Sequence, residues 1–343
     1  MVKVFVSHPP DQLETYFGAK ATRALSAIAE IRFNAEPGEL PVERLVAAAH
    51  DCEALIAYRQ TPAPEALFRD LPQLFAFLRC AVDIRTVDVT AASAHGVLVT
   101  QASAGYVAAV TEWIVATMID LARGIGRYAA AAREGRAPVP TVGRELRGST
   151  LGVIGLGRIG RALADVALAF GMRVVAADPQ PMAAPPGGAI RQVAFEDLLA
   201  ASDFVVCLAP ANAATEKLMD AAAFSSMRRG AFFVNAARGE LVDDDALLAA
   251  LESGHLAGCA LDVGRAPDQM PTRQLAAHPR VIATPHIGGL TQPAIEHQAL
   301  ETVEQLAMLV GGQLPPGAVN GAAASRWRRW CSGHLPAKPI FAS

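Results

Sequence analysis

Three ionisable side chains in the second half of the chain could do chemistry together. Each lies within three residues after a short apolar run: Arg238 after 231–235, Asp262 after 258–261 and His286 after 281–284. An arginine stabilises negative charge that develops on an oxygen, and a histidine gives or takes a proton near neutral pH. If the runs are strands of one parallel sheet, their carboxyl ends meet at the edge where open α/β sheets bind ligands. The three residues therefore predict a catalytic site, against the alternatives of a cap arginine, a turn aspartate and a loop histidine.

A glycine-rich turn lies earlier in the chain, between an apolar run and a helical pattern. The residues Gly155-Leu-Gly-Arg-Ile-Gly160 follow the run 151–154, and Asp178 ends the next run, 18 residues after Gly160. In such a turn the first glycine permits the bend, the second lets the backbone approach a pyrophosphate, and the third lets the helix pack on the strand. An acid about 20 residues further on holds the ribose hydroxyls. The pattern predicts a dinucleotide site in which Asp178 favours NAD over NADP, unless Asp178 is a solvated turn residue.

The elements that must position these residues alternate along the whole chain. Strand-like runs occur at Val2–Val6, Leu55–Tyr58, Phe77–Val82, Val97–Thr100 and Phe204–Leu208, with helical patterns such as Leu40–Ala49 between them and a long one over about 107–126. Strands that alternate with helices are typical of parallel sheets covered on both faces. We therefore expect an α/β protein of two Rossmann-like domains with doubly wound parallel sheets.

Composition excludes several classes of function. The 343 residues are 52% hydrophobic and 18% charged, with a formal net charge of −3 and basic residues scattered along the chain, so no nucleic-acid partner is expected. No apolar stretch has the length of a bilayer span and the start lacks a signal-peptide pattern, which predicts a cytoplasmic protein without a membrane partner. The five cysteines lack metal-ligand spacing, so no metal site is expected.

Four blocks of the sequence resemble the D-isomer-specific 2-hydroxyacid dehydrogenase family. They are Gly155–Gly160, Asn235–Asp243, Ala260–Val263 and Thr284–Gly289, and they occur in the family's order. The resemblance implies an NAD-binding domain, residues 101–290, inserted in a smaller substrate domain made of residues 1–100 and 291–320. It also implies a tail outside the core, residues 321–343, and a homodimer that pairs through the cofactor domain.

The resemblance further implies the reaction and the roles of individual residues. The reaction is the NAD-dependent interconversion of a D-2-hydroxy acid and its 2-keto acid. His286 would be the general acid/base, Arg238 the group that binds the substrate carboxylate and polarises the keto oxygen, and Asp262 a contact of the nicotinamide carboxamide. The other expected cofactor contacts are Gly155, Gly157, Arg158, Ile159, Gly160, Asp178, Pro210, Ala236 and Gly288.

One departure from the family's pattern lies in the substrate loop. Asp83 stands where a glycine is usual. A carboxylate there repels an anionic substrate unless it points away or pairs with Arg79 or Arg85. The loop therefore has a different shape from the family's or serves a different substrate.

A second departure concerns the partner of the catalytic histidine. Pro267 stands where the family has its catalytic glutamate, and Asp268 is beside it. We expect Asp268 to take over as the third catalytic residue, the alternatives being a solvated loop aspartate and a His286 oriented by the uncharged Gln269. The two departures leave a second class of function open, an NAD(H)-binding sensor or corepressor-like protein with little catalytic activity.

Overall fold

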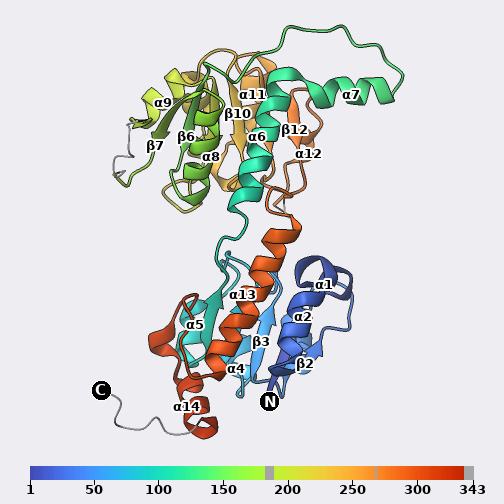
Figure 1. The fold of residues 1–343 in the computed structure, drawn as a ribbon, viewed down its shortest axis with the longest axis vertical. Coiled ribbons are helices and arrows are strands. Elements are labelled where there is room, and N and C mark those ends of the chain that lie inside the picture. The colour runs from blue at the N-terminus through green and yellow to red at the C-terminus, as the bar shows by residue number, and fades with distance from the viewer. Residues whose placement is uncertain (182–188, 267–268, 336–343) are drawn as a thin grey trace. The chain divides into compact units, whose positions relative to one another are not determined.

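The computed structural model describes residues 1–181, 189–266 and 269–335, and the chain divides into two compact units (Figure 1). Unit 1 takes the chain up to Gly105 and from Gln292 onward, and unit 2 is Tyr106–Thr291. Each unit is built on one sheet whose paired strands all run parallel. The predicted α/β class with two doubly wound parallel sheets is confirmed.

Unit 1 has a five-stranded sheet in the order β2-β1-β3-β4-β5. Its strands are β1 (Val2–Val6), β2 (Ala29–Phe33), β3 (Ala54–Ala57), β4 (Ala76–Arg79) and β5 (Leu98–Gln101). Its helices are α1 (Pro10–Tyr16), α2 (Gly18–Ser26), α3 (Val42–Ala49), α4 (Glu65–Asp70), α5 (Val89–Ala94), α13 (Gln292–Val310) and α14 (Ser325–His334), with a 3₁₀ turn at Gly321–Ala323.

Unit 1 has an apolar core on each face of its sheet. Strands β3 and β4 are buried along their whole length, as expected for parallel strands covered on both sides. Side chains of α2, α13 and α14 pack on one face, and side chains of α3, α4 and α5 pack on the other. The strand order places the topological switch point, where such sheets bind ligands, between β1 and β3.

The expectation that the chain after Asn320 lies outside the core is wrong for residues 325–334. Helix α14 places Trp327, only 8% exposed, in the core of unit 1, where its indole N–H donates to the Leu309 carbonyl. Arg326 donates to the carbonyls of Phe68, Leu71 and Leu74 around the end of α4, where a cation is favourable. Arg326 and Trp327 therefore anchor α14 on unit 1.

Replacing the buried indole should destabilise the protein strongly. We expect Trp327→Ala to lower the free energy of unfolding by about 3 kcal/mol, because a large core side chain is lost and the site can collapse only partly. Urea denaturation followed by circular dichroism measures the loss. Arg329→Ala, at an exposed position of the same helix, should stay within about 0.5 kcal/mol of the parent. Equal stability of the two variants would contradict the packing of α14.

Unit 2 has a seven-stranded sheet in the order β12-β11-β10-β9-β6-β7-β8. Its strands are β6 (Thr150–Ile154), β7 (Arg173–Ala177), β8 (Ile190–Gln192), β9 (Phe204–Cys207), β10 (Phe232–Asn235), β11 (Gly258–Leu261) and β12 (Val281–Ala283). Its helices are α6 (Val107–Arg123), α7 (Ile125–Arg133), α8 (Arg158–Ala169), α9 (Phe195–Ala201), α10 (Ala221–Ser226), α11 (Asp244–Glu252) and α12 (Arg273–Ala276), with a 3₁₀ turn at Gly239–Leu241.

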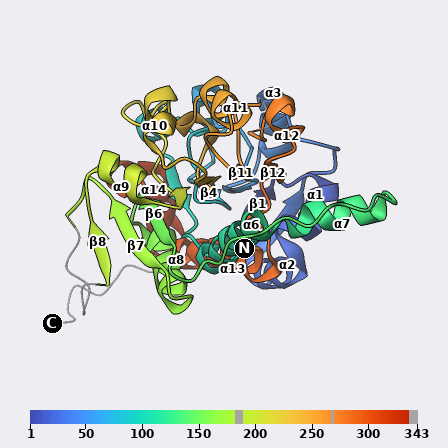
Figure 2. The same ribbon diagram turned by 90° about the horizontal axis from the view of Figure 1, so that it is seen from above.

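The sheet of unit 2 also has two apolar layers. Side chains of α6 and α8 fill one, and side chains of α9, α10 and α11 fill the other; Figure 2 shows α10 and α11 on the opposite side of β6 from α8. The strand order reverses between β6 and β9, as in dinucleotide-binding sheets, so a crevice for a ligand is expected beyond these two strands.

The long helical pattern predicted over 107–126 is two helices. Helix α6 ends at Arg123 because Gly124 adopts a left-handed conformation (φ 68°), a common way to end a helix. Helix α7 then extends away from the body of unit 2 (Figure 1). The apolar side chains of Ile125, Val139 and Val142 are exposed on α7 and on the segment that follows it.

Candidate functional site

The glycine-rich turn joins β6 to α8 at the switch point of unit 2. Gly155 has φ 93°, and a Cβ there would lie 2.8 Å from the carbonyl of Leu208, which follows β9. A Cβ on Gly160 would lie 2.4 Å from the oxygen of Gly155, so α8 packs on the turn as only glycine allows. A Cβ on Gly157 would meet no atom within 4 Å, which leaves the first turn of α8 open to an approaching group. The turn thus fits a bound pyrophosphate.

Asp178 is tied to this turn by hydrogen bonds and is half-buried. Its Oδ2 accepts from the amide of Leu156 at 2.7 Å, and its Oδ1 accepts from the amide of Gln180 at 2.8 Å. The Gln192 side chain donates to its backbone carbonyl. The carboxylate therefore stands at the carboxyl end of β7, next to the glycine turn, where an acid that holds ribose hydroxyls belongs.

Arg238 lies in the loop that leaves β10. Asn235, the last residue of the strand, shapes this loop, because its side chain donates to the Arg238 carbonyl and accepts from the Ala237 amide. Arg238 is half-buried, and its guanidinium donates to the Ala237 carbonyl at 2.7 Å. A cation is thus held at the carboxyl edge of the sheet.

His286 and Asp262 lie beyond the two neighbouring strands. Asp262 directly follows β11, is 3% exposed, and accepts from the Thr284 hydroxyl and from the amides of Ile287 and Gly288. His286 is half-buried after β12 and has φ 55°, a left-handed conformation that non-glycine residues adopt rarely. Strands β10, β11 and β12 pair side by side, so Arg238, Asp262 and His286 share one edge of the sheet.

Two glycines bring the loops that follow β10 and β11 together. A Cβ on Gly239 would lie 2.1 Å from the carbonyl carbon of Gly264. A Cβ on Gly264 would lie 2.4 Å from the carbonyl oxygen of Met270 and from the Cα of Pro271. No side chain fits at either crossing, so the loop that carries Arg238 is braced by the loop that begins at Gly264.

The other expected cofactor contacts surround the glycine turn or the catalytic edge. Arg158 is exposed on the first turn of α8 and Ile159 packs on the core beside it. Pro210 is exposed after β9, and Ala236 is half-buried after β10. Gly288 donates its amide to Asp262. Asp268 and Pro267 lie outside the described residues, and Gln269 has an exposed side chain.

Asp83, in unit 1, pairs with Arg85. Its oxygens accept from the Arg85 amide and guanidinium, with Nη2 2.9 Å from Oδ2. A carboxylate at this position was expected either to point away from the substrate or to form an ion pair, and Asp83 forms the ion pair. The negative charge of Asp83 is therefore paired with a neighbouring cation.

The carboxyl edge of the sheet in unit 1 holds two buried basic groups that sequence reasoning did not assign to a site. The Arg79 guanidinium is fully buried and donates to the carbonyls of Tyr58 and Thr61 and to the Thr86 hydroxyl, and burial lowers its pKa to about 10. His8, just beyond β1, is buried against Phe17 and Tyr58, and burial lowers its pKa to about 3. The positions of Arg79 and His8 at the carboxyl ends of strands could have indicated them from the sequence.

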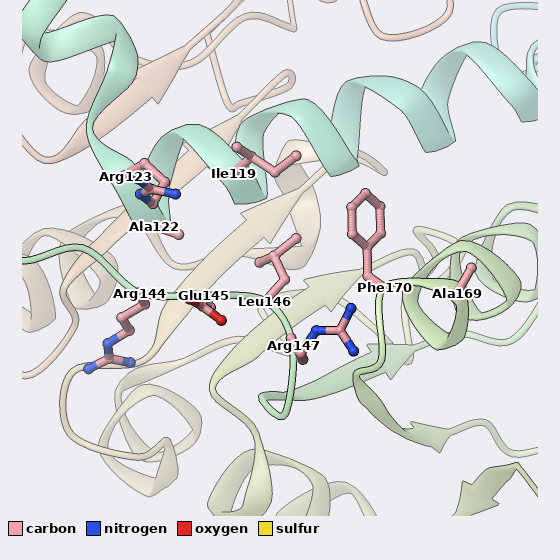
Figure 3. Close-up of a pocket in the computed structure, with 9 residues that line it drawn as sticks. All are labelled: Ile119, Ala122, Arg123, Arg144, Glu145, Leu146, Arg147, Ala169 and Phe170. Atoms are coloured by element: carbon pink, nitrogen blue, oxygen red, sulfur yellow. The ribbon is translucent and has the colours of Figure 1, made fainter.

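A cavity of about 270 Å³ lies elsewhere in unit 2, at the amino end of β6 (Figure 3). It is lined by Ile119, Ala122, Arg123, Arg144, Glu145, Leu146, Arg147, Ala169 and Phe170. The guanidinium groups of Arg144 and Arg147 point in different directions, and the Glu145 carboxylate lies between them. The glycine turn is at the other end of β6, so this cavity is separate from the candidate site.

The described part of the chain has neither a metal-binding cluster nor a membrane-spanning helix. Residues 1–181, 189–266 and 269–335 contain no group of three or more His, Cys, Asp or Glu side chains that could hold a metal ion. Within the same ranges, no helix is both long and apolar enough to cross a membrane.

Comparison with known proteins agrees with this geometry. Residues 115–288 match the family model for the D-isomer specific 2-hydroxyacid dehydrogenase, NAD binding domain. D-3-phosphoglycerate dehydrogenase of Rattus norvegicus is 35% identical over 292 residues, which is 84% of this chain and 54% of the rat protein. The chain thus spans about half the length of the curated relatives it matches.

Two solved structures share the fold over nearly the whole chain. The TT0316 protein from Thermus thermophilus has a TM-score of 0.82 and 32% identity, covering 93% of this chain and all of that one. D-Lactate dehydrogenase from Aquifex aeolicus, complexed with NAD and lactic acid, has a TM-score of 0.77 and 26% identity, covering 93% and 99%. The predicted cofactor, NAD, is confirmed by the matched NAD-binding domain. The chain belongs to the D-isomer specific 2-hydroxyacid dehydrogenase family.

Proposed function

We propose that the protein is an NAD-dependent oxidoreductase that interconverts a D-2-hydroxy acid and its 2-keto acid. The observation that carries the proposal is the common edge of β10, β11 and β12, where Arg238 and a left-handed His286 lie beyond the two strands that flank β11. The family match supports the reaction class. The alternative of a sensor with little activity loses one of its two reasons, because Asp83 is paired with Arg85.

Each side chain has a distinct role in the proposed reaction. NAD, when bound, supplies and accepts the hydride. Arg238 holds the substrate carboxylate and stabilises the charge that develops on the keto oxygen, and His286 donates the proton to that oxygen. In the direction of oxidation the same histidine accepts the proton. Asp262 keeps its proposed contact with the nicotinamide carboxamide. Gly155, Gly157 and Gly160 form the turn that would hold the pyrophosphate.

We assign the cofactor to unit 2 and name unit 1 the substrate domain. The proposed limits are residues 101–290 for the NAD-binding domain and residues 1–100 with 291–320 for the substrate domain. The glycine turn and the family match to residues 115–288 support the first assignment. The switch point of the unit 1 sheet, between β1 and β3, supports the second.

The proposed function is tested by substrate screening. Oxidation of NADH by the purified chain is followed with a panel of 2-keto acids that differ in side-chain size and charge. Turnover of at least one of them, with the D-hydroxy acid as the product in chiral chromatography, is the expected result. NADH binding without any turnover across the panel would favour the sensor.

Cofactor preference depends on Asp178 in this proposal. The unmodified protein is expected to use NADH far better than NADPH, because a carboxylate there accepts from ribose hydroxyls and repels the 2′-phosphate. Asp178→Ala should reduce the ratio of the two catalytic efficiencies by roughly 10-fold or more, while Asp165→Ala on α8 should leave it unchanged. Equal use of both cofactors by the parent would refute the role of Asp178.

Asp268 is proposed as the charged partner of His286. A carboxylate within about 4 to 6 Å favours the imidazolium, which keeps the proton available for keto-acid reduction up to a higher pH. Asp268→Asn should therefore lower the upper apparent pKa of the reductive pH profile, so that activity fails at lower pH than in the parent. A profile of unchanged shape and height would rule out this pairing.

We also propose a homodimer and a cytoplasmic location. The exposed apolar side chains of Ile125, Val139 and Val142 in unit 2 support pairing through the cofactor domain. The five cysteines are free thiols, which is usual in a reducing compartment. Sedimentation equilibrium of the purified chain at micromolar concentration should give twice the chain mass, and a monomer would contradict the dimer.

A further inference from the structure

The Asp262 carboxylate holds the backbone on both sides of His286. Its Oδ1 accepts from the Thr284 hydroxyl at 2.6 Å and from the Ile287 amide at 2.8 Å, and its Oδ2 accepts from the Gly288 amide at 2.7 Å. One donor precedes His286 in the chain and two follow it. The carboxylate therefore brackets the histidine.

The backbone conformation of His286, between these hydrogen bonds, is unfavourable by itself. His286 has φ 55°, and its amide donates to the Thr284 carbonyl at 3.0 Å, which makes a tight turn. A left-handed conformation costs a residue with a Cβ free energy and persists only where the surroundings impose it. The three hydrogen bonds to Asp262 are the interactions that impose it here, since they fix the residues before and after the turn.

The Asp262 carboxylate is confined by its surroundings. Asp262 is 3% exposed, and burial raises its pKa, whereas Thr284, Gly288 and Ile287 counteract that rise by donating to the charged form. A Cβ on Gly288 would lie 2.8 Å from Oδ2 of Asp262, so a side chain at that position would push the carboxylate away. The buried Asp262 carboxylate, its three hydrogen-bond donors and Gly288 therefore all stabilise the short turn at His286.

We propose that Asp262 and Thr284 are positioning residues that hold His286 in its left-handed conformation and thereby aim its imidazole at the substrate oxygen. This role rests on the proposed function, in which His286 carries the proton. It differs from the contact with the nicotinamide carboxamide, because it acts through the backbone of the turn and needs the Thr284 hydroxyl.

The Thr284 hydroxyl can be removed with little change in the shape of the side chain. Thr284→Val deletes one of the three donors, and Thr284→Ser keeps it. We expect Thr284→Val to lower kcat for 2-keto acid reduction by roughly 10-fold or more, because a small misplacement of a catalytic group is costly. KM and the Kd for NADH should change less than about three-fold, and Thr284→Ser should restore most of kcat. Thr291→Val is the matched control, since its hydroxyl makes no hydrogen bond within the described part of the chain.

A second measurement needs no activity. Carbethoxylation of His286 by diethylpyrocarbonate, followed by mass spectrometry of the peptides, reports how the imidazole is held, with His255 and His278 as internal references. Its rate should change several-fold in Thr284→Val and return to the parent value in Thr284→Ser. Asp262→Asn, which replaces an acceptor oxygen by a donor NH₂, should show the same pattern more strongly.

The outcomes separate this inference from the proposed function. A parent protein that reduces no 2-keto acid refutes the function, and the carbethoxylation rates still decide whether Asp262 and Thr284 hold His286. Unchanged kcat and unchanged carbethoxylation in Thr284→Val overturn the inference, as does an equal loss in the Val and Ser variants. In Thr284→Val, a weaker affinity for NADH with unchanged kcat overturns it too, because the Thr284 hydroxyl would then support only the cofactor contact of Asp262.

Discussion

His286→Gln is expected to lower kcat for the reduction of a good 2-keto acid by about 10² or more. Glutamine retains a polar side chain of similar size but has no proton to give at neutral pH. The negative charge that develops on the keto oxygen would then be stabilised by Arg238 alone. Because the imidazole serves the chemical step, the Kd for NADH should not change, and the loss should appear in kcat far more than in KM.

Stopped-flow single turnovers with NADH and the best 2-keto acid measure this step directly. His50→Gln is the control, because His50 is exposed in unit 1 and its ring contacts the Ala47 carbonyl and the nearby Asp51. The control should match the parent within experimental error. If His286→Gln turns over like His50→Gln, His286 has a structural role.

The second large loss of activity is expected when Arg238 is replaced. Arg238→Gln should lower kcat/KM by about 10³, because one guanidinium both binds the substrate carboxylate and stabilises charge in the transition state. Unlike the histidine variant, it should raise KM as well as lower kcat. Arg238→Lys keeps the charge but loses the planar fork of donors, so it should fall between the parent and the Gln variant.

Steady-state kinetics over a range of 2-keto acid concentrations separates the two contributions. Arg273→Gln is the matched control, since Arg273 is a residue of α12 in the same unit. The role of Arg238 would be refuted if Arg238→Gln kept its kcat/KM within a few-fold of the Arg273→Gln value.

Most strands of this fold could be predicted because they are buried on both faces, whereas the less buried edge strands β2 and β8 were not predicted. Runs such as 204–207 and 258–261 are apolar at every position, and the chain bends shortly after each of them. Parallel strands also place their carboxyl ends at one edge, so naming the residue after each strand predicted the candidate site. Arg238, Asp262 and His286 stand on neighbouring strands for this reason.

Features that depend on contacts between distant residues could not be predicted. Whether Asp83 pairs with Arg79 or with Arg85 depends on the shape of the loop, and Arg79 is turned inward toward the carbonyl of Tyr58. The packing of Trp327 depends on apolar side chains of α13, which the local sequence does not describe. The left-handed turn at His286 likewise follows from hydrogen bonds to a residue 24 positions away.

The crossing of the loops at Gly239 and Gly264 limits how this protein can be diversified. A side chain at either glycine would collide with backbone, and the displacement would reach Arg238 through the adjacent peptide. Saturation libraries aimed at new substrates should therefore leave both glycines unchanged. The ion pair of Asp83 and Arg85 in unit 1 is a better target, because it lies partly exposed and its exchange leaves Thr86, which binds the buried Arg79, unchanged.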